Sequence, residues 1–242
     1  MSNFKIISQR KLCDAVYEMI LEGDTSKITV PGQFVNIKLP EFYLRRPISV
    51  CDVQENRLTL IYKVVGKGTE KMAALADGYE FDVLCGLGNG FEVRDEKSCV
   101  LVGGGVGVPP MYLLCKRLIE KGIKPTVVMG FASKKDVFYE DEFKALGVEV
   151  KIATNDGTYG TKGFVTTILD GMDFKALYAC GPTPMLKALT KYDAHCQLSL
   201  EERMGCGFGA CMGCSIQTKN GYKRVCKDGP VFNKEELLWD TI

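Results

Sequence analysis

Two patterns of hydrophobic positions divide the chain near residue 97. In the first part apolar side chains recur at every second position, as in residues 58–64, where Leu58, Leu60 and Tyr62 share one face. This period is typical of half-buried strands, and turn residues such as Gly23-Asp24 separate the runs. We expect strands at residues 13–21, 33–39, 47–53, 58–64 and 79–84, and a short helix at 69–76 with Thr69 as its N-cap. Short strands at this spacing predict a small antiparallel barrel.

After residue 97 the pattern changes to strands that alternate with helices. The predicted strands cover residues 99–102, 126–129, 148–153 and 176–180. The predicted helices cover residues 109–121, 140–146, 162–169 and 184–192. This alternation predicts a parallel, doubly wound sheet. The whole chain is therefore expected to be a multidomain β plus α/β protein, with an antiparallel β-barrel in residues 1–97, an α/β domain in 98–196 and a small third domain in 197–242.

The third part carries four cysteines in an ordered pattern. Cys206, Cys211, Cys214 and Cys226 form C-x4-C-x2-C-x11-C, with glycines between them. A loop that holds four thiolates around two irons must fold back on itself and turn backbone N–H groups towards the inorganic sulfides, and glycine permits both. The spacing is that of plant-type [2Fe–2S] sites. The alternatives are a four-cysteine zinc site, which more often has two C-x2-C pairs, and four unrelated buried thiols.

A glycine-rich loop joins the first strand and the first helix of the second part. Gly103, Gly105, Gly107 and Pro110 follow the strand at 99–102, with the proline where a dinucleotide-binding fingerprint has its last glycine. Backbone N–H groups at the start of the helix can hold a diphosphate, and glycine lets the ligand lie against the main chain. An ordinary tight turn is the alternative.

The motif Cys180-Gly181-Pro182 ends the last predicted strand of the second part. Ligands bind at the carboxyl ends of parallel strands, so a thiol at this position would lie near the reacting ring of a bound coenzyme. A buried cysteine before a Gly-Pro turn explains the same residues without a ligand.

Two motifs in the first part are candidates for binding a flavin nucleotide. In Arg46-Pro47-Ile48-Ser49 the guanidinium can pair with a phosphate, and the hydroxyl can hydrogen-bond a flavin ring edge. Residues 66–69 lie at the start of the short helix and form a second anion-binding candidate. A solvated arginine and a plain helix cap are the alternatives.

Composition excludes several classes of function. The net charge is +1 with no block of like charges, so the sequence lacks the basic cluster that nucleic-acid binding requires. The uncharged stretch at 98–115 has glycines and prolines at its centre, and we reject it as a membrane span. Eleven cysteines without a signal segment lead us to expect a reducing cytoplasm. His195 is the only histidine, which excludes His-rich metal sites, and we expect it at a helix end. The carboxylates of Glu201-Glu202 are expected to be solvated.

Together these motifs resemble the ferredoxin–NADP reductase superfamily. The run at 200–214 and the order of the three parts are similar to the electron-transfer subunits of two-subunit, NAD-linked dihydroorotate dehydrogenases, over essentially the whole chain. The resemblance implies a flavin-binding barrel, a nicotinamide domain and a C-terminal [2Fe–2S] domain, with FAD, the cluster and NAD as cofactors. It also implies that Ser49 and Cys180 act at the reacting ring.

The same resemblance assigns the other site residues. Those implied to contact FAD are Arg46, Pro47, Ile48, Ser49, Ile61, Tyr62, Lys63, Gly68 and Thr69. Those implied on the NAD side are Gly103, Gly105, Gly107 and Pro110, and the implied cluster ligands are Cys206, Cys211, Cys214 and Cys226. One departure is that Pro47-Ile48 stands where many superfamily members have a tyrosine before the serine, so an aromatic ring that covers the flavin is missing there.

A mechanism and a partner follow from the resemblance. A [2Fe–2S] cluster passes one electron and nicotinamide exchanges a hydride, so FAD must stand between them. In the resembling family an FMN-containing catalytic subunit oxidises dihydroorotate in pyrimidine biosynthesis, and the electrons reach NAD+ through the cluster and FAD. The implied assembly is a cytoplasmic heterotetramer with two copies of each subunit.

Two other functions and one question of specificity stay open. Related FAD/[2Fe–2S] modules serve sulfite or sulfur reductases, hydrogenases and ferredoxin–NADP transhydrogenases. A non-enzymatic zinc-binding interaction module with four cysteine ligands is the third candidate. Lys134-Lys135 follow the second parallel strand and suit either a 2′-phosphate site or an exposed loop, so NAD is preferred over NADP only on family grounds.

Overall fold

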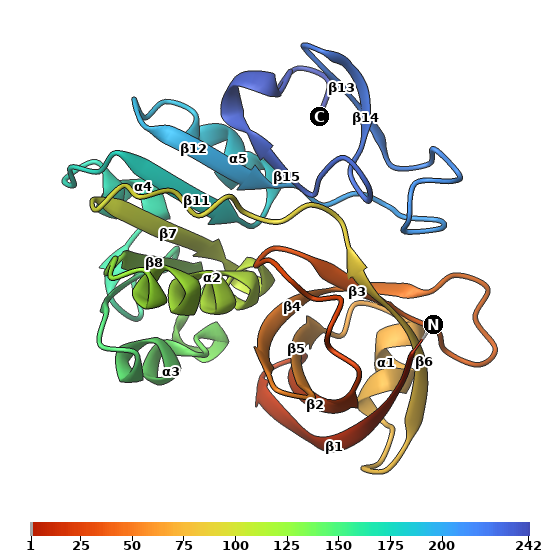
Figure 1. The fold of residues 1–242 in the computed structure, drawn as a ribbon. Helices are drawn as coiled ribbons and strands as arrows, with labels where there is room; N and C mark the ends of the chain where they lie inside the picture. The colour runs from red at the N-terminus through yellow and green to blue at the C-terminus, as the bar shows by residue number, and fades with distance from the viewer. Residues whose placement is uncertain (1) are drawn as a thin grey trace.

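The computed structural model describes residues 2–242, and its first six strands form a closed antiparallel barrel (Figure 1). The order around the barrel is β1-β2-β5-β4-β3-β6. The strands are β1 (Ser2–Cys13), β2 (Val16–Gly23), β3 (Phe34–Ile37), β4 (Arg46–Gln54), β5 (Arg57–Lys63) and β6 (Glu80–Leu87), with helix α1 (Lys67–Ala73) between β5 and β6. The barrel predicted from the alternating pattern is confirmed.

Two details of the predicted barrel differ from the structure. The strand expected at 13–21 corresponds to β2, which begins only at Val16 because a turn with Ala15 at a φ of 59° separates it from β1. The sequence hides β1 because most of its side chains are at least partly exposed and only Phe4 and Ile6 are buried. Thr69 is not the N-cap of α1, since Gly66 takes that position and the Thr69 hydroxyl accepts a hydrogen bond from the Gly66 N–H at 3.2 Å.

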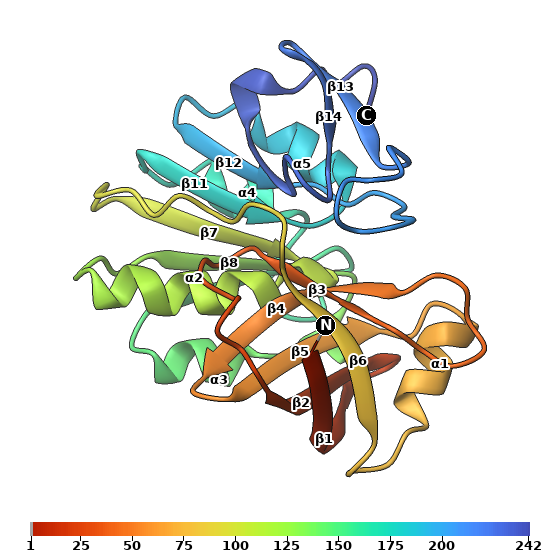
Figure 2. The ribbon, with the colours of Figure 1, turned by 45° about the vertical axis from the view of Figure 1, so that its right-hand side comes forward.

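The second part of the chain folds around a seven-stranded sheet in the order β10-β9-β8-β7-β11-β12-β15 (Figure 2). Its strands are β7 (Cys99–Gly104), β8 (Thr126–Phe131), β9 (Glu149–Thr154), β10 (Thr161–Lys162), β11 (Ala176–Cys180), β12 (His195–Ser199) and β15 (Val231–Asn233). Its helices are α2 (Pro109–Glu120), α3 (Glu140–Ala145), α4 (Val165–Leu169) and α5 (Thr183–Leu189), and short 3-10 helices lie at Gly105–Gly107, Lys134–Asp136 and Lys234–Glu236. Every strand pair in the sheet is parallel except β12 with β15.

Helices cover both faces of this sheet, as the doubly wound prediction requires. The apolar side chains of α2 and α3 pack with Leu101 and Val127 on one face. Those of α4 and α5 pack with Val100 and Val128 on the other. Adjacent residues of β7 thus point to opposite cores, which explains why this strand is an uninterrupted apolar run.

The C-terminal segment is interwoven with the same sheet. Strands β13 (Ser215–Thr218) and β14 (Gly221–Arg224) form a hairpin, and the chain then returns so that β15 pairs antiparallel with β12. His195 begins β12 rather than ending a helix, because α5 stops at Leu189, so that expectation is wrong. The division into residues 1–97, 98–196 and 197–242 remains a prediction, and its second boundary falls inside β12.

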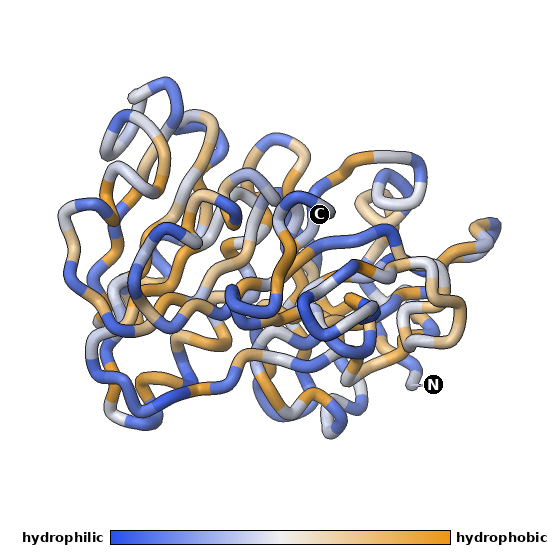
Figure 3. Tube along the Cα trace, turned by 90° about the horizontal axis from the view of Figure 1, so that it is seen from above, coloured by the Kyte–Doolittle hydropathy of each residue, from blue (hydrophilic) through white to orange (hydrophobic). Residues whose placement is uncertain are grey.

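Hydrophobic segments lie mostly in the interior and hydrophilic segments in the outer turns (Figure 3). Within residues 2–242 no helix is both long enough and apolar enough to cross a membrane. The stretch at 98–115 instead forms β7, the glycine loop and the start of α2, as the sequence predicts.

The barrel and the parallel sheet meet at a junction of buried polar groups. The Tyr139 hydroxyl donates to Glu18 Oε2 at 2.7 Å, and Arg10 Nε donates to Glu18 Oε1 at 2.6 Å. The Lys116 ammonium of α2 lies 2.7 and 2.9 Å from the two carboxylate oxygens of Asp52 in β4. Glu18 and Asp52 are 6% and 5% exposed, so both carboxylates depend on these partners.

We expect Tyr139→Phe to loosen this junction. Loss of a hydrogen bond to a buried carboxylate should lower the free energy of unfolding by about 1.5–3 kcal/mol. Chemical denaturation measures the change, with Tyr222→Phe as the control because Tyr222 is exposed. Equal stability of the two variants would contradict a structural role for the Tyr139–Glu18 bond.

Candidate functional site

The glycine loop and the motif at Cys180 come together where the strand order of the sheet reverses. Strands β7 and β11 are parallel neighbours, and Gly103 and Cys180 are paired at their carboxyl ends. A Cβ at Gly107 would lie 2.2 Å from the carbonyl oxygen of Cys180, so only glycine allows this approach. In open α/β sheets such a reversal point is where ligands bind.

A cavity of about 580 Å³ opens beside this point. Its walls come from both parts of the chain, with Cys13 and Lys63 from the barrel and Gly105, Phe131 and Met185 from the parallel sheet and its connections. A cavity of this size fits part of a dinucleotide between two walls that the buried junction holds in place.

The four predicted NAD-side residues have different places in the loop. Gly105 lines the cavity, has a φ of +52°, and has open space where a Cβ would be. Gly103 packs against Val108, and Pro110 is buried in the first turn of α2. Gly105 is thus the residue among the four that faces the cavity, whereas the others shape the loop.

The thiol of Cys180 is buried and uncharged. Burial and, to a smaller extent, nearby Glu201 raise the pKa of Cys180 to about 12, although an interaction with Ser199 acts to lower it. Cys180 therefore offers a neutral S–H group near the loop, and a thiolate nucleophile is excluded at neutral pH.

Glu201 is a candidate residue that sequence reasoning missed. It was expected to be solvated, and its side chain is indeed reached by solvent. The protein atoms around it nevertheless raise its carboxyl pKa by desolvation, and its charge acts on Cys180. Glu201 comes near Cys180 because β12 pairs with β11. The sequence did not predict β12, so it could not predict this proximity.

The two flavin motifs of the barrel also meet in space. The guanidinium of Arg46 lies directly over Gly68, where a Cβ would be 2.1 Å from Nε, and over the ring of Phe42 at 4.6 Å. The Thr69 hydroxyl already makes hydrogen bonds within the loop before α1. It donates to the Gly66 carbonyl at 2.9 Å and accepts from the Val65 N–H at 2.9 Å. Arg46 and the backbone at Gly68 thus form one edge suited to a diphosphate.

The remaining predicted FAD residues lie along β4 and β5. Ser49 is partly exposed and pairs with Phe34 of β3. Tyr62 is 2% exposed, and its hydroxyl donates to Gln9 Oε1 at 3.0 Å, so it belongs to the barrel core. Ile61 packs in the core shared with the sheet, and Lys63 lines the cavity. Direct contact of these side chains with FAD remains a prediction.

The four predicted metal ligands form two pairs. The N–H of Cys206 donates to Cys211 Sγ at 3.4 Å, and the N–H of Cys211 donates to Cys206 Sγ at 3.4 Å. In the second pair the N–H of Cys226 donates to Cys214 Sγ at 3.4 Å. Backbone N–H groups therefore already point at the sulfur atoms.

The environments of the two pairs differ. For Cys206, burial acts to raise the pKa, but N–H groups of Cys211, Phe208 and Ala210 and the Cys211 thiol lower it to about 6. For Cys226, burial and the neighbouring Cys214 raise the pKa to about 12. Cys206 thus favours the thiolate through its N–H donors, whereas Cys226 needs a nearby cation to do so.

The pairing of the four thiols fits a binuclear cluster. A structural zinc site needs four ligands around one point, whereas a [2Fe–2S] cluster needs two thiolates on each of two irons. Two separate thiol pairs, each with N–H donors, match the second requirement.

Two family models match the chain. The model for the iron-sulfur cluster binding domain of dihydroorotate dehydrogenase B matches residues 201–238. The model for the oxidoreductase NAD-binding domain matches residues 101–191. The fold and these matches define the chain as an oxidoreductase with a flavin-reductase-type barrel, an NAD-binding domain and a [2Fe–2S] segment.

Similar proteins give the family. The electron transfer subunits of dihydroorotate dehydrogenase B (NAD(+)) from Shouchella clausii (strain KSM-K16) and Bacillus pumilus (strain SAFR-032) are each 47% identical to the chain, and each match covers 96% of both proteins. The chain belongs to this family of electron transfer subunits, as its resemblance implied.

Solved structures support the fold and show a second relationship. A NADH-dependent reduced ferredoxin-NADP oxidoreductase has a TM-score of 0.89 and 33% identity, covering 98% of this chain and 90% of that one. Phthalate dioxygenase reductase has a TM-score of 0.67 at 18% identity, covering 90% and 86%, and this likeness concerns the fold alone.

We expect Cys226→Ala to abolish iron binding. Removing one thiolate from the buried pair leaves an iron without its full ligand set, so the iron content should fall to background in an iron assay. Cys196→Ala is the matched control, because Cys196 is equally buried but lies in β12. Full iron content in the Cys226 variant would show that this thiol is not a ligand.

Proposed function

We propose that the chain carries electrons from an FMN-containing dihydroorotate dehydrogenase catalytic subunit to NAD+. The observation that supports this most directly is that the barrel touches both other sites. Lys63 of the barrel lines the cavity beside the glycine loop, and Asn36 of β3 contacts the cysteine loop. A flavin in the barrel would thus have a nicotinamide site on one side and a one-electron carrier on the other.

The residues of the chain fit FAD, which when bound supplies the conversion between one-electron and hydride transfer. Arg46 with the backbone at Gly68 would hold the diphosphate, and Ser49 would hydrogen-bond the ring edge. The buried thiol of Cys180 would contribute packing and a neutral S–H donor beside the nicotinamide. The junction between barrel and sheet keeps these groups at a fixed separation.

The coenzyme cavity has an exposed aromatic ring and a charged depression beside it. Phe164 lines the cavity with 66% of its surface exposed, so its ring is free to stack on a base. Asp156 lies in a neighbouring depression together with Lys134 and Lys135. Hydrogen bonds from Thr158 lower the pKa of Asp156, so the depression holds one carboxylate beside two ammonium groups, and the preference for NAD rests on the NAD(+)-linked relatives.

We expect Phe164→Ala to weaken NADH binding. Loss of ring stacking worth about 0.5–1.5 kcal/mol should raise KM for NADH by up to about tenfold while kcat for flavin reduction changes little. Steady-state diaphorase assays measure both constants. Tyr222→Ala removes an aromatic ring that is also exposed but lies in the β14 hairpin, and it should leave KM unchanged. An unchanged KM in the Phe164 variant would remove this residue from the coenzyme site.

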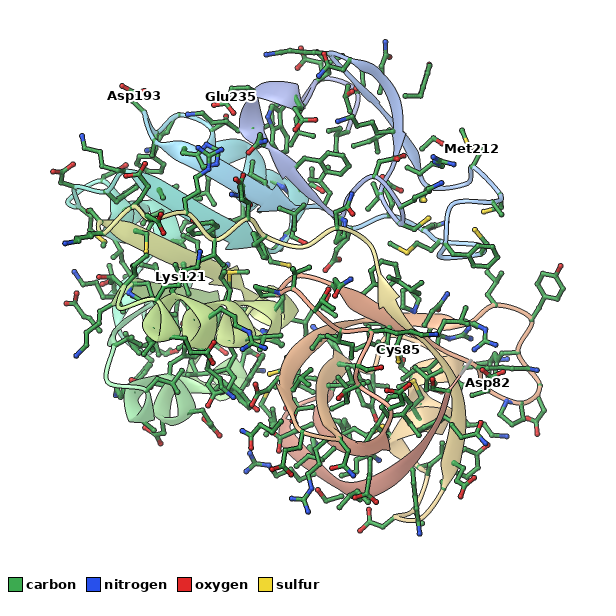
Figure 4. All side chains as sticks on the ribbon, viewed as in Figure 1. Asp82, Cys85, Lys121, Asp193, Met212 and Glu235 are labelled. Atoms are coloured by element: carbon green, nitrogen blue, oxygen red, sulfur yellow. The ribbon has the colours of Figure 1, made fainter. Side chains whose placement is uncertain are left out.

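The cysteine loop carries exposed apolar side chains that offer a surface to the catalytic subunit. Phe208 and Met212 are 55% and 53% exposed, and Met212 projects from the outer edge of the C-terminal segment (Figure 4). Tyr43 and Leu44, in the loop before β4, are also exposed. Apolar side chains beside a cluster that must receive electrons from another protein fit a docking surface. The two-plus-two stoichiometry and a cytoplasmic location are part of the same proposal.

We expect Phe208→Asp to prevent assembly with the catalytic subunit. A charge at the centre of an apolar interface would be desolvated without a partner, so complex formation in size-exclusion chromatography should be lost. NADH should still bleach the flavin of the isolated chain. Val65→Asp is the control, because Val65 is 78% exposed but lies before α1. Normal assembly of the Phe208 variant would place the interface elsewhere.

A visible spectrum and an iron assay of the anaerobically purified chain test the function itself. Flavin and cluster bands that bleach with NADH, and with dihydroorotate only when the catalytic subunit is present, are the expected result. The second candidate is a module of a ferredoxin–NADP transhydrogenase, favoured by the 33% identity to the NADH-dependent ferredoxin-NADP oxidoreductase. Bleaching by NADH without any response to dihydroorotate and the catalytic subunit would favour that candidate.

A further inference from the structure

The cysteine loop at 205–214 rests on one buried side chain of the barrel. Asn36 in β3 is 1% exposed, and its Nδ2 donates a hydrogen bond to the carbonyl of Cys206 at 3.2 Å. The next residue, Gly207, has a φ of +79°, and a Cβ there would lie 2.3 Å from the same Nδ2. The loop backbone therefore approaches Asn36 so closely that a side chain at position 207 would displace the loop or the amide.

An amide is a costly residue at this buried strand position. The neighbouring Val35 and Ile37 are both 0% exposed and belong to the barrel core. The Oδ1 atom of Asn36 is buried and has no hydrogen-bond partner within residues 2–242. An unpaired buried acceptor destabilises the fold, so the benefit of the amide must lie in the bond that Nδ2 makes.

The barrel, and not the loop, fixes the position of Asn36. Asn36 pairs with Pro47 of the flavin motif. Arg45 Nη1 donates to the Asn36 carbonyl at 3.3 Å, and Arg45 Nη2 is held by Asp82 Oδ2 at 2.8 Å. The strand pair that presents Arg46 and Ser49 therefore also presents the amide to the cysteine loop.

We propose that Asn36 is a positioning residue that sets the separation between the flavin and the cluster through its hydrogen bond to the carbonyl of Cys206. This inference rests on the proposed function. In the step concerned one electron leaves the reduced cluster, which is oxidised, and enters the flavin, which is reduced. No bond between heavy atoms forms or breaks, and any proton that the flavin takes up comes from solvent. The same contact governs the reverse transfer, which NADH drives.

Three variants of the cofactor-loaded chain test the proposal. Asn36→Leu removes the amide, Asn36→Asp keeps its shape without the donor, and Gly207→Ala pushes the loop away while Asn36 stays intact. Asn89→Ala is the matched control, because Asn89 Nδ2 also donates to a carbonyl of the C-terminal segment, that of Asp228 at 3.2 Å, but outside the cysteine loop.

The measurement is anaerobic stopped-flow reduction by NADH, with freeze-quench EPR of the cluster. We expect wild-type FAD and iron contents and wild-type flavin bleaching, but cluster reduction slowed several-fold, because a displaced loop lengthens the distance that the electron must cross. The EPR line shape of the reduced cluster should change as the Cys206 carbonyl loses its donor. The Asn89 variant should match the wild type in both readouts.

Different outcomes overturn the inference and the proposed function. Cluster reduction at the wild-type rate in the Asn36 and Gly207 variants, or equal slowing in Asn89→Ala, would overturn the role of Asn36. If Asn36→Leu does not fold, Gly207→Ala and Asn36→Asp decide the matter by the same criterion. A wild-type chain whose flavin does not bleach with NADH would instead contradict the proposed function.

Discussion

Two buried carboxylates with partners across the junction of the barrel and the parallel sheet are the constraint on which the rest of the structure depends. Asp52 forms an ion pair with Lys116, and Glu18 accepts a hydrogen bond from Tyr139. A relative movement of the two parts would leave both carboxylates without these partners, and breaking a buried ion pair alone costs about 3–5 kcal/mol. The cavity beside the glycine loop has one wall on each side of this junction.

The cysteine loop is held by different means. Its contacts are hydrogen bonds to backbone carbonyls, from Asn36 to Cys206 and from Arg224 Nη1 to Gly209 at 2.8 Å, and Asp228 holds Arg224 in turn. Phe208 and Met212 meanwhile remain exposed. A loop fixed through its main chain keeps its side chains available for another surface, which suits a site that exchanges electrons with a second protein.

The accuracy of the sequence predictions follows the range of the interactions involved. The cysteine spacing, the strand–loop–helix at 99–121 and the strand at 176–180 are local patterns. The fold confirms the last two, and the family model for the iron-sulfur domain matches the cysteine segment. β1 and β12 were missed because their places depend on pairing with distant strands. Glu201 and Asn36 were missed for the same reason, since neither residue type in its local context indicates a site.

The sequence by itself determined the chemistry that the chain supports. Four thiols within 21 positions, a glycine loop after an apolar strand and an Arg-x-x-Ser motif were sufficient to predict the cofactors and the family. The tertiary structure decided which of these residues meet. Gly107 lies against Cys180, Arg46 lies over Gly68, and Asn36 contacts Cys206 across 170 positions of the chain. Local spacing limits which ligands the residues can bind, whereas contacts of this range depend on how two cores pack together, and no short stretch of sequence contains that information.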